Sequence, residues 1–167
     1  MAAMPSLTYR GFGLAAAMAA AAALGVALAS ERWGGLAPCA LCLVERWPYR
    51  VAIVLGLAAA FLPPKAAHVA LALLALTVLT GAVLAAIHVG VEFHWWPSPL
   101  PECAAPTFGG GSIAERLARM PAVPAKPCDD PTYFVRGLPL SVAAMNLIFA
   151  SLFTIAATWF AIRRPSP

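Results

Sequence analysis

The chain of 167 residues is long enough for one domain with a packed core and too short for two large ones. Apolar residues make up 62% of it, charged residues only 11%, and the mean hydropathy is +0.81. Because about a quarter of the residues in soluble domains are charged, this composition excludes an ordinary soluble protein and predicts an integral membrane protein. The net charge of +4 comes from scattered Lys and Arg residues without a basic stripe, which argues against nucleic-acid binding.

The first apolar stretch, residues 11–30, contains no charged residue. A helix needs about 20 apolar residues to cross a bilayer, so this stretch is long enough to span. Its apolar core is longer than that of a typical signal peptide, and no small-x-small cleavage pattern follows it. We therefore expect a retained membrane anchor.

The second stretch, residues 51–62, is too short to span by itself. It reaches about 20 residues only if the helix begins near Leu43, which brings Arg46 into the membrane interface and puts Cys42 at the helix start or just outside it. Proline suits the first turn of a helix and disrupts its interior, so Pro48 allows either a kink or a helix start near Trp47.

Two further stretches complete the pattern. Residues 66–91 carry a histidine near each end, and residues 138–162 are free of charge and stop before a pair of arginines. The segment between them is rich in proline and shows no sustained periodicity. We predict an all-α membrane protein, a four-transmembrane-helix bundle forming a single integral membrane domain over 1–167, with spans near 11–30, 43–62, 66–91 and 138–162 and a long extramembrane loop at 92–137.

Four spans place both termini on one side of the membrane and two cysteine-bearing loops on the other. Cys39 and Cys42 lie in the first of these loops, Cys103 and Cys128 in the second. An even number of cysteines, all outside the spans, fits thiol chemistry in an oxidising compartment. A count of Lys and Arg favours the opposite orientation, so the predicted orientation rests on the cysteines.

A Cys-x-x-Cys pair has several common meanings. Zinc needs two more ligands at suitable spacing, whereas Cys103 and Cys128 stand 25 residues apart without a second short pair, so we expect no metal site. Covalent haem needs a histidine directly after the pair, and Leu43 stands there. Two structural disulfides remain possible, although so small a ring removes little entropy from the unfolded chain.

Redox activity gives the pair a reason to stand at a helix start. A thiolate is favoured at a helix N-terminus and beside a cation. Arg46 follows Cys42 by four residues, so the two side chains share a helical face. An arginine at the membrane interface requires a partner. A thiolate, the oxygen of a membrane-soluble electron carrier, Glu45 and a lipid phosphate all satisfy this requirement.

Four sequence features together resemble one protein family. They are "PCALCLVER" at the second span, "HVGVE" at the end of the third, two cysteines in a long loop, and "GLPLSVAAMNL" at the start of the fourth. This order is similar to that of the DsbB family of disulfide bond formation proteins, over nearly the whole chain. The Cys-x-x-Cys-x-x-Glu-Arg motif and the four-cysteine arrangement are specific, whereas the alanine-rich first span is not.

The resemblance implies a membrane thiol-quinone oxidoreductase. A reduced DsbA-like carrier would attack a disulfide between Cys103 and Cys128, with Cys103 forming the mixed disulfide. Cys128 would then exchange with Cys39. Cys42 would pass the electrons to ubiquinone or menaquinone held against Arg46.

The resemblance also implies a quinone-side role for the histidine of the third span, best matched by His88. An interfacial residue at a helix end is the alternative for His88, and Glu92 and His94 follow too closely to be separated from it. The implied location is the bacterial inner membrane, in contact with the quinone pool, with the cysteine loops facing the periplasm.

The long loop contains one helical pattern. Residues 112–120 begin with the Ser-x-x-Glu capping box of Ser112 and Glu115, and Ile113, Leu117 and Met120 form an apolar stripe. We predict a short helix on the membrane surface that keeps Cys103 and Cys128 near the Cys-x-x-Cys, with an ordinary loop turn as the alternative.

Some aromatic and polar residues call for separate interpretations. The family often has a tryptophan shortly after the last cysteine, where this chain has Tyr133 and Phe134 instead. We interpret Trp95 and Trp96 as interfacial anchors and Asn146 as an interhelical hydrogen-bonding residue.

Two rival functions predict different sequences or behaviour. A quinone-linked enzyme of the vitamin K epoxide reductase type shares a four-helix plan, but its Cys-x-x-Cys is expected late in the bundle. A non-catalytic membrane scaffold with two structural disulfides would have no electron transfer to lose.

Overall fold

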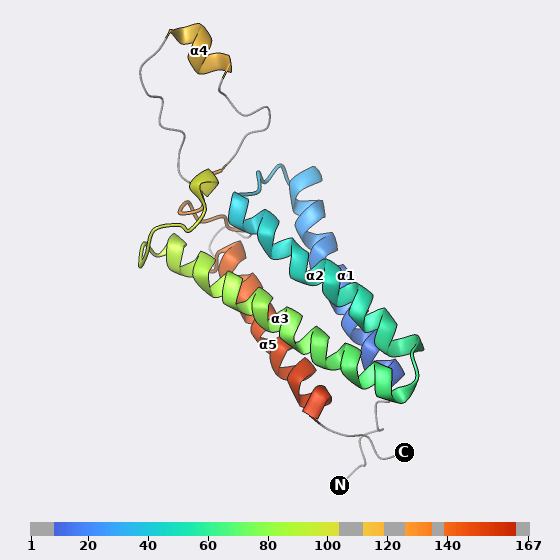
Figure 1. The fold of residues 1–167 in the computed structure, drawn as a ribbon. Helices are drawn as coiled ribbons and strands as arrows, with labels where there is room; N and C mark the ends of the chain where they lie inside the picture. Colours follow the sequence, from blue (N-terminus) through green and yellow to red (C-terminus); the bar gives the residue numbers. More distant parts are fainter. Residues whose placement is uncertain (1–8, 104–111, 119–125, 135–138, 163–167) are drawn as a thin grey trace.

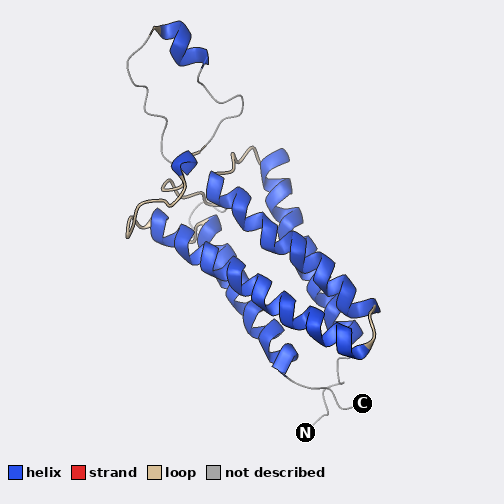
Figure 2. Ribbon diagram, viewed as in Figure 1, coloured by secondary structure: helices blue, strands red, loops and turns tan. Residues whose placement is uncertain are grey.

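The computed structural model describes residues 9–103, 112–118, 126–134 and 139–162. Among these residues no strand is present, and the backbone forms a single isolated bridge, between Cys39 and Lys126 (Figure 2). The fold is therefore all-α, as predicted. In chain order the helices are α1 (Tyr9–Arg32), α2 (Ala40–Phe61), α3 (Pro64–Glu92), the 3-10 helix η1 (Pro101–Cys103), α4 (Ile113–Ala118) and α5 (Val142–Ile162).

The four long helices α1, α2, α3 and α5 lie side by side (Figure 1). α2 packs against α1 and α3, and α3 also packs against α5. The turn between α2 and α3 lies at one end of this arrangement, and the start of α2 and η1 lie at the other (Figure 1). Both cysteine-bearing segments are thus at the same end of the helices.

Three of the long helices, α1, α3 and α5, are long and apolar enough to cross a membrane, which makes this a multi-pass membrane protein. α2 has 22 residues but carries Glu45, Arg46 and Arg50 in its first half. These charges set it apart from the other three by composition.

The start of α2 differs from the prediction. The helix begins at Ala40 and continues through Pro48, so the predicted start near Trp47 is wrong and the start near Leu43 is three residues late. Cys39 caps the helix, because its Sγ accepts a hydrogen bond from the backbone N–H of Cys42 at 3.1 Å. Pro48 is buried against α3 where Gly81 leaves space, and a Cβ at Gly81 would lie 3.1 Å from the Cβ of Pro48.

The last helix, in contrast, begins later than predicted. α5 starts at Val142 instead of residue 138, which itself lies outside the described residues. The hydroxyl of Ser141 accepts a hydrogen bond from the N–H of Ala144 at 3.1 Å, which is the geometry of a helix N-cap. Apolar composition continues across this cap, so hydropathy alone did not reveal it.

The capping box in the long loop is confirmed. The N–H of Ser112 donates to Oε2 of Glu115 at 3.0 Å, and the N–H of Glu115 donates to Oγ of Ser112 at 3.3 Å. Within the described residues α4 covers Ile113–Ala118, and residues 119 and 120 of the predicted helix lie outside them. Its position on a membrane surface stays a prediction.

Helices α1 and α2 cross where two glycines face each other. A Cβ at Gly13 would lie 2.6 Å from the carbonyl oxygen of Gly56, and a Cβ at Gly56 would lie 2.7 Å from that of Gly13. Neither space accepts a side chain, so the two backbones are in direct contact. Small residues at helix interfaces allow this close approach in membranes.

We predict that Gly13→Ala destabilises the protein by about 1–3 kcal/mol, because the added methyl group forces the two helices apart. The matched control is Gly25→Ala on the same helix, where a Cβ would meet nothing within 4 Å. Thermal unfolding in detergent, followed by circular dichroism, should give a lower midpoint for Gly13→Ala only. Equal midpoints for the two variants would show that this helix contact does not limit stability.

Candidate functional site

Cys39 and Cys42 lie at the start of α2, where the helix cap holds them together. Their sulfur atoms are 2.6 Å apart and are not joined in a disulfide. Cys39 is buried and Cys42 is partly buried. Closing this pair to a disulfide, or opening it to a dithiol, requires only a small movement of the two side chains.

Cys103 and Cys128 form a disulfide next to this pair. Both are buried in one cluster with Cys39, Leu41 and Val91, and Cys42 packs against the same cluster. The backbone bridge between Cys39 and Lys126 holds the segment before Cys128 against the start of α2. The fold therefore brings together two cysteine pairs that are far apart in the sequence.

His88, on α3, reaches the first pair. Its Nε2 lies 3.5 Å from Sγ of Cys39, and its Nδ1 lies 2.8 Å from Oε1 of Glu45. The side chain is almost completely buried, with 3% exposed. Because a carboxylate only accepts hydrogen bonds, the Nδ1–H donates to Glu45, and Nε2 is directed to the sulfur.

The structure also separates the three polar residues at the end of α3. His94 is exposed and lies 3.8 Å from Asp129. Glu92 lines the cavity described below and accepts a hydrogen bond from the hydroxyl of Ser141. His88 alone among the three contacts a cysteine sulfur in the described structure.

Glu45 is the residue whose importance the sequence analysis missed. It is 6% exposed, and both of its oxygens are used, Oε1 by His88 and Oε2 by the amide of Asn146 at 2.6 Å. The Oδ1 of Asn146 accepts a hydrogen bond from the hydroxyl of Tyr49 at 2.5 Å. The prediction that Asn146 makes interhelical hydrogen bonds is confirmed. A glutamate three residues after a cysteine in an apolar helix was itself a signal, since a buried carboxylate requires partners.

Arg46 pairs with a residue that the sequence analysis did not consider. Its Nη2 lies 2.8 Å from Oε2 of Glu31, in the last turn of α1, and the arginine is 9% exposed. Glu45, one of the predicted partners, is occupied by His88 and Asn146 instead.

A cavity of about 430 Å³ adjoins these residues. Residues of α1 and α5 form its apolar walls, whereas Phe12 of α1 and Phe160 of α5 stack at 3.9 Å nearer the other end of these helices. The cavity thus lies between α1 and α5 at the cysteine end. Its α1 wall consists mostly of small residues: Ala19, Ala22, Ala23, Leu24, Val26, Ala27 and Ser30.

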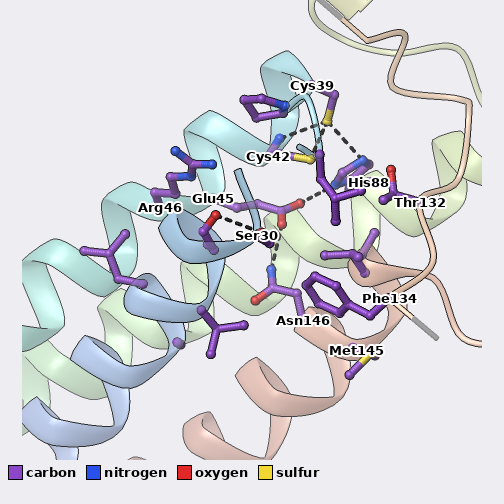
Figure 3. Close-up of a pocket in the computed structure, with 18 of the residues that line it drawn as sticks. Ser30, Cys39, Cys42, Glu45, Arg46, His88, Thr132, Phe134, Met145 and Asn146 are labelled. Carbon is purple, nitrogen blue, oxygen red and sulfur yellow. Dashed lines mark hydrogen bonds and ion pairs between the residues drawn. The ribbon is translucent and has the colours of Figure 1, made fainter. Parts of the chain in front are cut away.

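The polar groups gather in one corner of this cavity (Figure 3). Among them are the side chains of Cys39, Cys42, Glu45, Arg46 and His88, and the polar residues Glu92, Lys126, Asp130, Thr132 and Asn146 also line the cavity. Phe134 and Met145 contribute apolar side chains, whereas Trp95 and Trp96 do not line the cavity. An apolar cavity with a few convergent polar groups is typical of a site for a small organic ligand.

A comparison with models of known protein families shows to which family this chain belongs. A family model described as "Disulfide bond formation protein DsbB" matches residues 9–160, most of the chain. The chain belongs to the DsbB family. Comparisons with curated proteins and with solved structures found no match. Membership supports a role in disulfide bond formation, and the DsbB family is generally linked to quinones.

In this member of the DsbB family, the environment of Cys39 favours its thiolate. The pKa of Cys39 is lowered from its ordinary value, first by the hydrogen bond from the side chain of Cys42 and also by the backbone N–H of Cys42. Burial and the charge of Glu45 oppose this effect without cancelling it. Hydrogen bonds to a charged group favour the charged form, so these two contacts favour the thiolate of Cys39.

We predict that reduced Cys39 reacts with iodoacetamide at a lower pH than an ordinary thiol, because only the thiolate reacts and a lowered pKa extends the thiolate to lower pH. Cys42→Ala removes the side-chain hydrogen bond that is the largest cause of the lowered pKa of Cys39. The midpoint of the profile of rate against pH should therefore move to higher pH. The rates are measured by mass spectrometry with Cys103 and Cys128 both replaced by Ser, which leaves one thiol pair. An unchanged midpoint in Cys42→Ala would contradict this role of Cys42.

Proposed function

We propose that this chain is a membrane thiol-quinone oxidoreductase. It takes two electrons from a reduced, DsbA-like carrier of the thioredoxin fold and passes them to ubiquinone or menaquinone in the membrane, which supports disulfide bond formation. One observation carries the proposal. The Cys39–Cys42 pair lies between a second cysteine pair and an apolar cavity, so it has a thiol donor on one side and space for an apolar acceptor on the other.

The proposed topology has four membrane spans, with α2 as the fourth. α2 has 22 residues and packs between α1 and α3, and its charges are confined to its first half. Its outer surface after these charges is apolar and exposed, with Val51, Val54, Leu57 and Phe61. The chain then forms a single domain in the bacterial inner membrane, with the cysteine end at the periplasm and Trp95 and Trp96 as interfacial anchors.

The first step of the proposed reaction uses the exchange of disulfides. A thiolate of the carrier attacks the Cys103–Cys128 disulfide and forms a mixed disulfide with Cys103, and Cys128 leaves as a thiolate. The second carrier thiolate then attacks the carrier sulfur of this mixed disulfide and releases Cys103. The carrier ends as a disulfide, and Cys103 and Cys128 have gained its two electrons.

The second step passes these electrons to the first pair. The Cys128 thiolate attacks Cys39 of a Cys39–Cys42 disulfide, and Cys42 leaves as a thiolate. Attack of Cys103 on Cys128 then restores the Cys103–Cys128 disulfide and releases Cys39. The arrangement in the structure, a Cys103–Cys128 disulfide beside free Cys39 and Cys42, corresponds to the product of this step.

The residues around the cavity fit a quinone. A volume of about 430 Å³ lies within the range of roughly 300–1,000 Å³ found for small-molecule sites. When bound, a quinone supplies a sink for two electrons and two protons. His88 holds Nε2 beside the sulfur of Cys39, where it can accept the thiol proton, and Arg46 places a positive charge on the cavity wall.

Quinone reduction by the purified protein in detergent tests this function, with a reduced thioredoxin-fold carrier as the electron donor. We predict that the native chain reduces quinone and that Cys42→Ser abolishes the reaction. Cys103→Ser should block electron transfer from the carrier but retain quinone reduction driven by dithiothreitol, which can reduce the first pair directly.

Two results would contradict the proposed path. Carrier-driven quinone reduction that persists in Cys103→Ser would show that the order of transfer is wrong. No reduction by the correctly folded native chain with an active carrier would favour a scaffold with structural disulfides. Circular dichroism in the same detergent confirms the folding of each variant.

Arg46→Ala should raise the apparent KM for quinone about tenfold or more, the effect expected from the loss of one charge-assisted contact in an apolar site. The expected physical cause is a lost contact with the ligand, so the thermal midpoint should change less than the KM. The assay is the same quinone reduction at varied quinone concentration.

Two matched variants separate this role from the ion pair of Arg46. Glu31→Gln removes the salt bridge but leaves the guanidinium on the cavity wall, so it should change KM much less than Arg46→Ala. Arg50→Ala removes an exposed cation of the same helix, which lies over the ring of Trp47, and should leave KM unchanged. Equal effects of Glu31→Gln and Arg46→Ala on KM would show that Arg46 acts through its ion pair with Glu31 and not through contact with the quinone.

A further inference from the structure

The side chains of the site also bring together three atoms of the kind that bind a metal ion. Sγ of Cys39, Sγ of Cys42 and Nε2 of His88 all lie within 4.8 Å of one another. Two thiolates and an imidazole are a common donor set for Zn²⁺. No sequence motif predicts this set, because His88 follows Cys39 by 49 residues and the spacing of the four cysteines does not match a zinc motif.

We propose that the chain binds one zinc ion through Cys39, Cys42 and His88 when both cysteines are reduced. Zn–S bonds of about 2.3 Å and Zn–N bonds of about 2.0 Å in a tetrahedron place sulfur and nitrogen about 3.5 Å apart. Nε2 of His88 lies 3.5 Å from Sγ of Cys39, which fits this geometry without movement.

The second sulfur needs a small adjustment. Two thiolates on one tetrahedral zinc stand about 3.8 Å apart, whereas the two sulfurs here are separated by 2.6 Å. Cys42 is only partly buried and lines the cavity, so its side chain has space to move away from Cys39. The fourth position of the ion then faces the cavity, where water can complete the coordination.

The hydrogen bonds that orient His88 support the same inference. A histidine that binds zinc usually donates its other ring N–H to a carboxylate, which fixes the ring and makes the ligating nitrogen more basic. Glu45 makes this contact, with Oε1 at 2.8 Å from Nδ1 of His88, and the amide of Asn146 holds its other oxygen at 2.6 Å. His88 is thereby oriented with Nε2 toward the sulfurs.

Zinc bound here occupies both thiolates, so neither can attack a disulfide or form one. The ion is therefore an inhibitor of the reduced state, and oxidation of the pair to a disulfide removes two of its three protein ligands. The binding itself does not rest on the proposed function, because it is measured without electron transfer.

The test uses the full-length protein in detergent with Cys103→Ser and Cys128→Ser, so that one thiol pair remains. The protein is reduced with dithiothreitol, desalted without oxygen, and titrated with Zn²⁺ against a chelating indicator. We expect one ion per reduced chain, none after the pair is oxidised, and an affinity at least about tenfold lower in His88→Ala. Unchanged affinity in a folded His88→Ala variant overturns the site and indicates adventitious binding to the thiols alone.

Two further measurements make the result independent of the folding of that variant. X-ray absorption of the zinc-loaded protein with His88 intact should show two sulfur ligands and a histidine nitrogen, and a spectrum without the imidazole contribution overturns the proposal. Glu45→Gln should weaken zinc binding about tenfold through the loss of the carboxylate behind His88. Glu31→Gln, a carboxylate change at the ion pair of Arg46, should not, and equal effects of these two variants would also contradict the site.

Discussion

The buried carboxylate of Glu45 is the constraint on which the geometry of the site depends. A charged group removed from water costs several kcal/mol unless each of its hydrogen-bonding positions is satisfied. Glu45 meets this requirement with one residue of α3 and one of α5, His88 and Asn146, so a single side chain of α2 links three helices. The same contacts turn the imidazole so that its second nitrogen points to Cys39. The position of the reactive sulfur relative to its basic neighbour is thus a consequence of how a buried charge is compensated.

The two cysteine pairs are held together by backbone and not only by side chains. The bridge between Cys39 and Lys126 places the second cysteine segment along the start of α2, and the N–H of Cys128 donates to the carbonyl of Cys103 at 3.3 Å. Farther along this segment, the carbonyl of Thr132 accepts the N–H of Val142 at the start of α5 at 2.8 Å. The segment is therefore fixed at both of its ends to helices of the bundle.

Hydropathy predicted both ends of α1 and α3 closely, because the length of an apolar run and its lack of charge are local properties. The start of α2 was less predictable, since Pro48 suggests a boundary, whereas in the structure the helix continues through Pro48 and its ring packs where Gly81 of α3 leaves room. Cys39, Cys42, Arg46 and His88 stood out by residue type and motif, and their joint position on one cavity depends on the packing of the helices. The pairing of Arg46 with Glu31 follows from where α1 ends beside α2, and no sequence spacing encodes that distance.

The walls of the cavity have a consequence for how a ligand reaches it. Val26, on the α1 wall, is 57% exposed, and Met145, on the α5 wall, is 38% exposed, so side chains of both walls reach the surface of the bundle. In a bilayer with both helices as spans, this surface faces the acyl chains. A ligand that enters there partitions into the lipid first, and the amount available to the site is set by its mole fraction in the membrane and by lateral diffusion. At a constant amount of ligand, occupancy of the cavity would then fall as the lipid-to-protein ratio rises, because added lipid dilutes the ligand within the membrane. A site that takes its ligand from water does not experience this dilution.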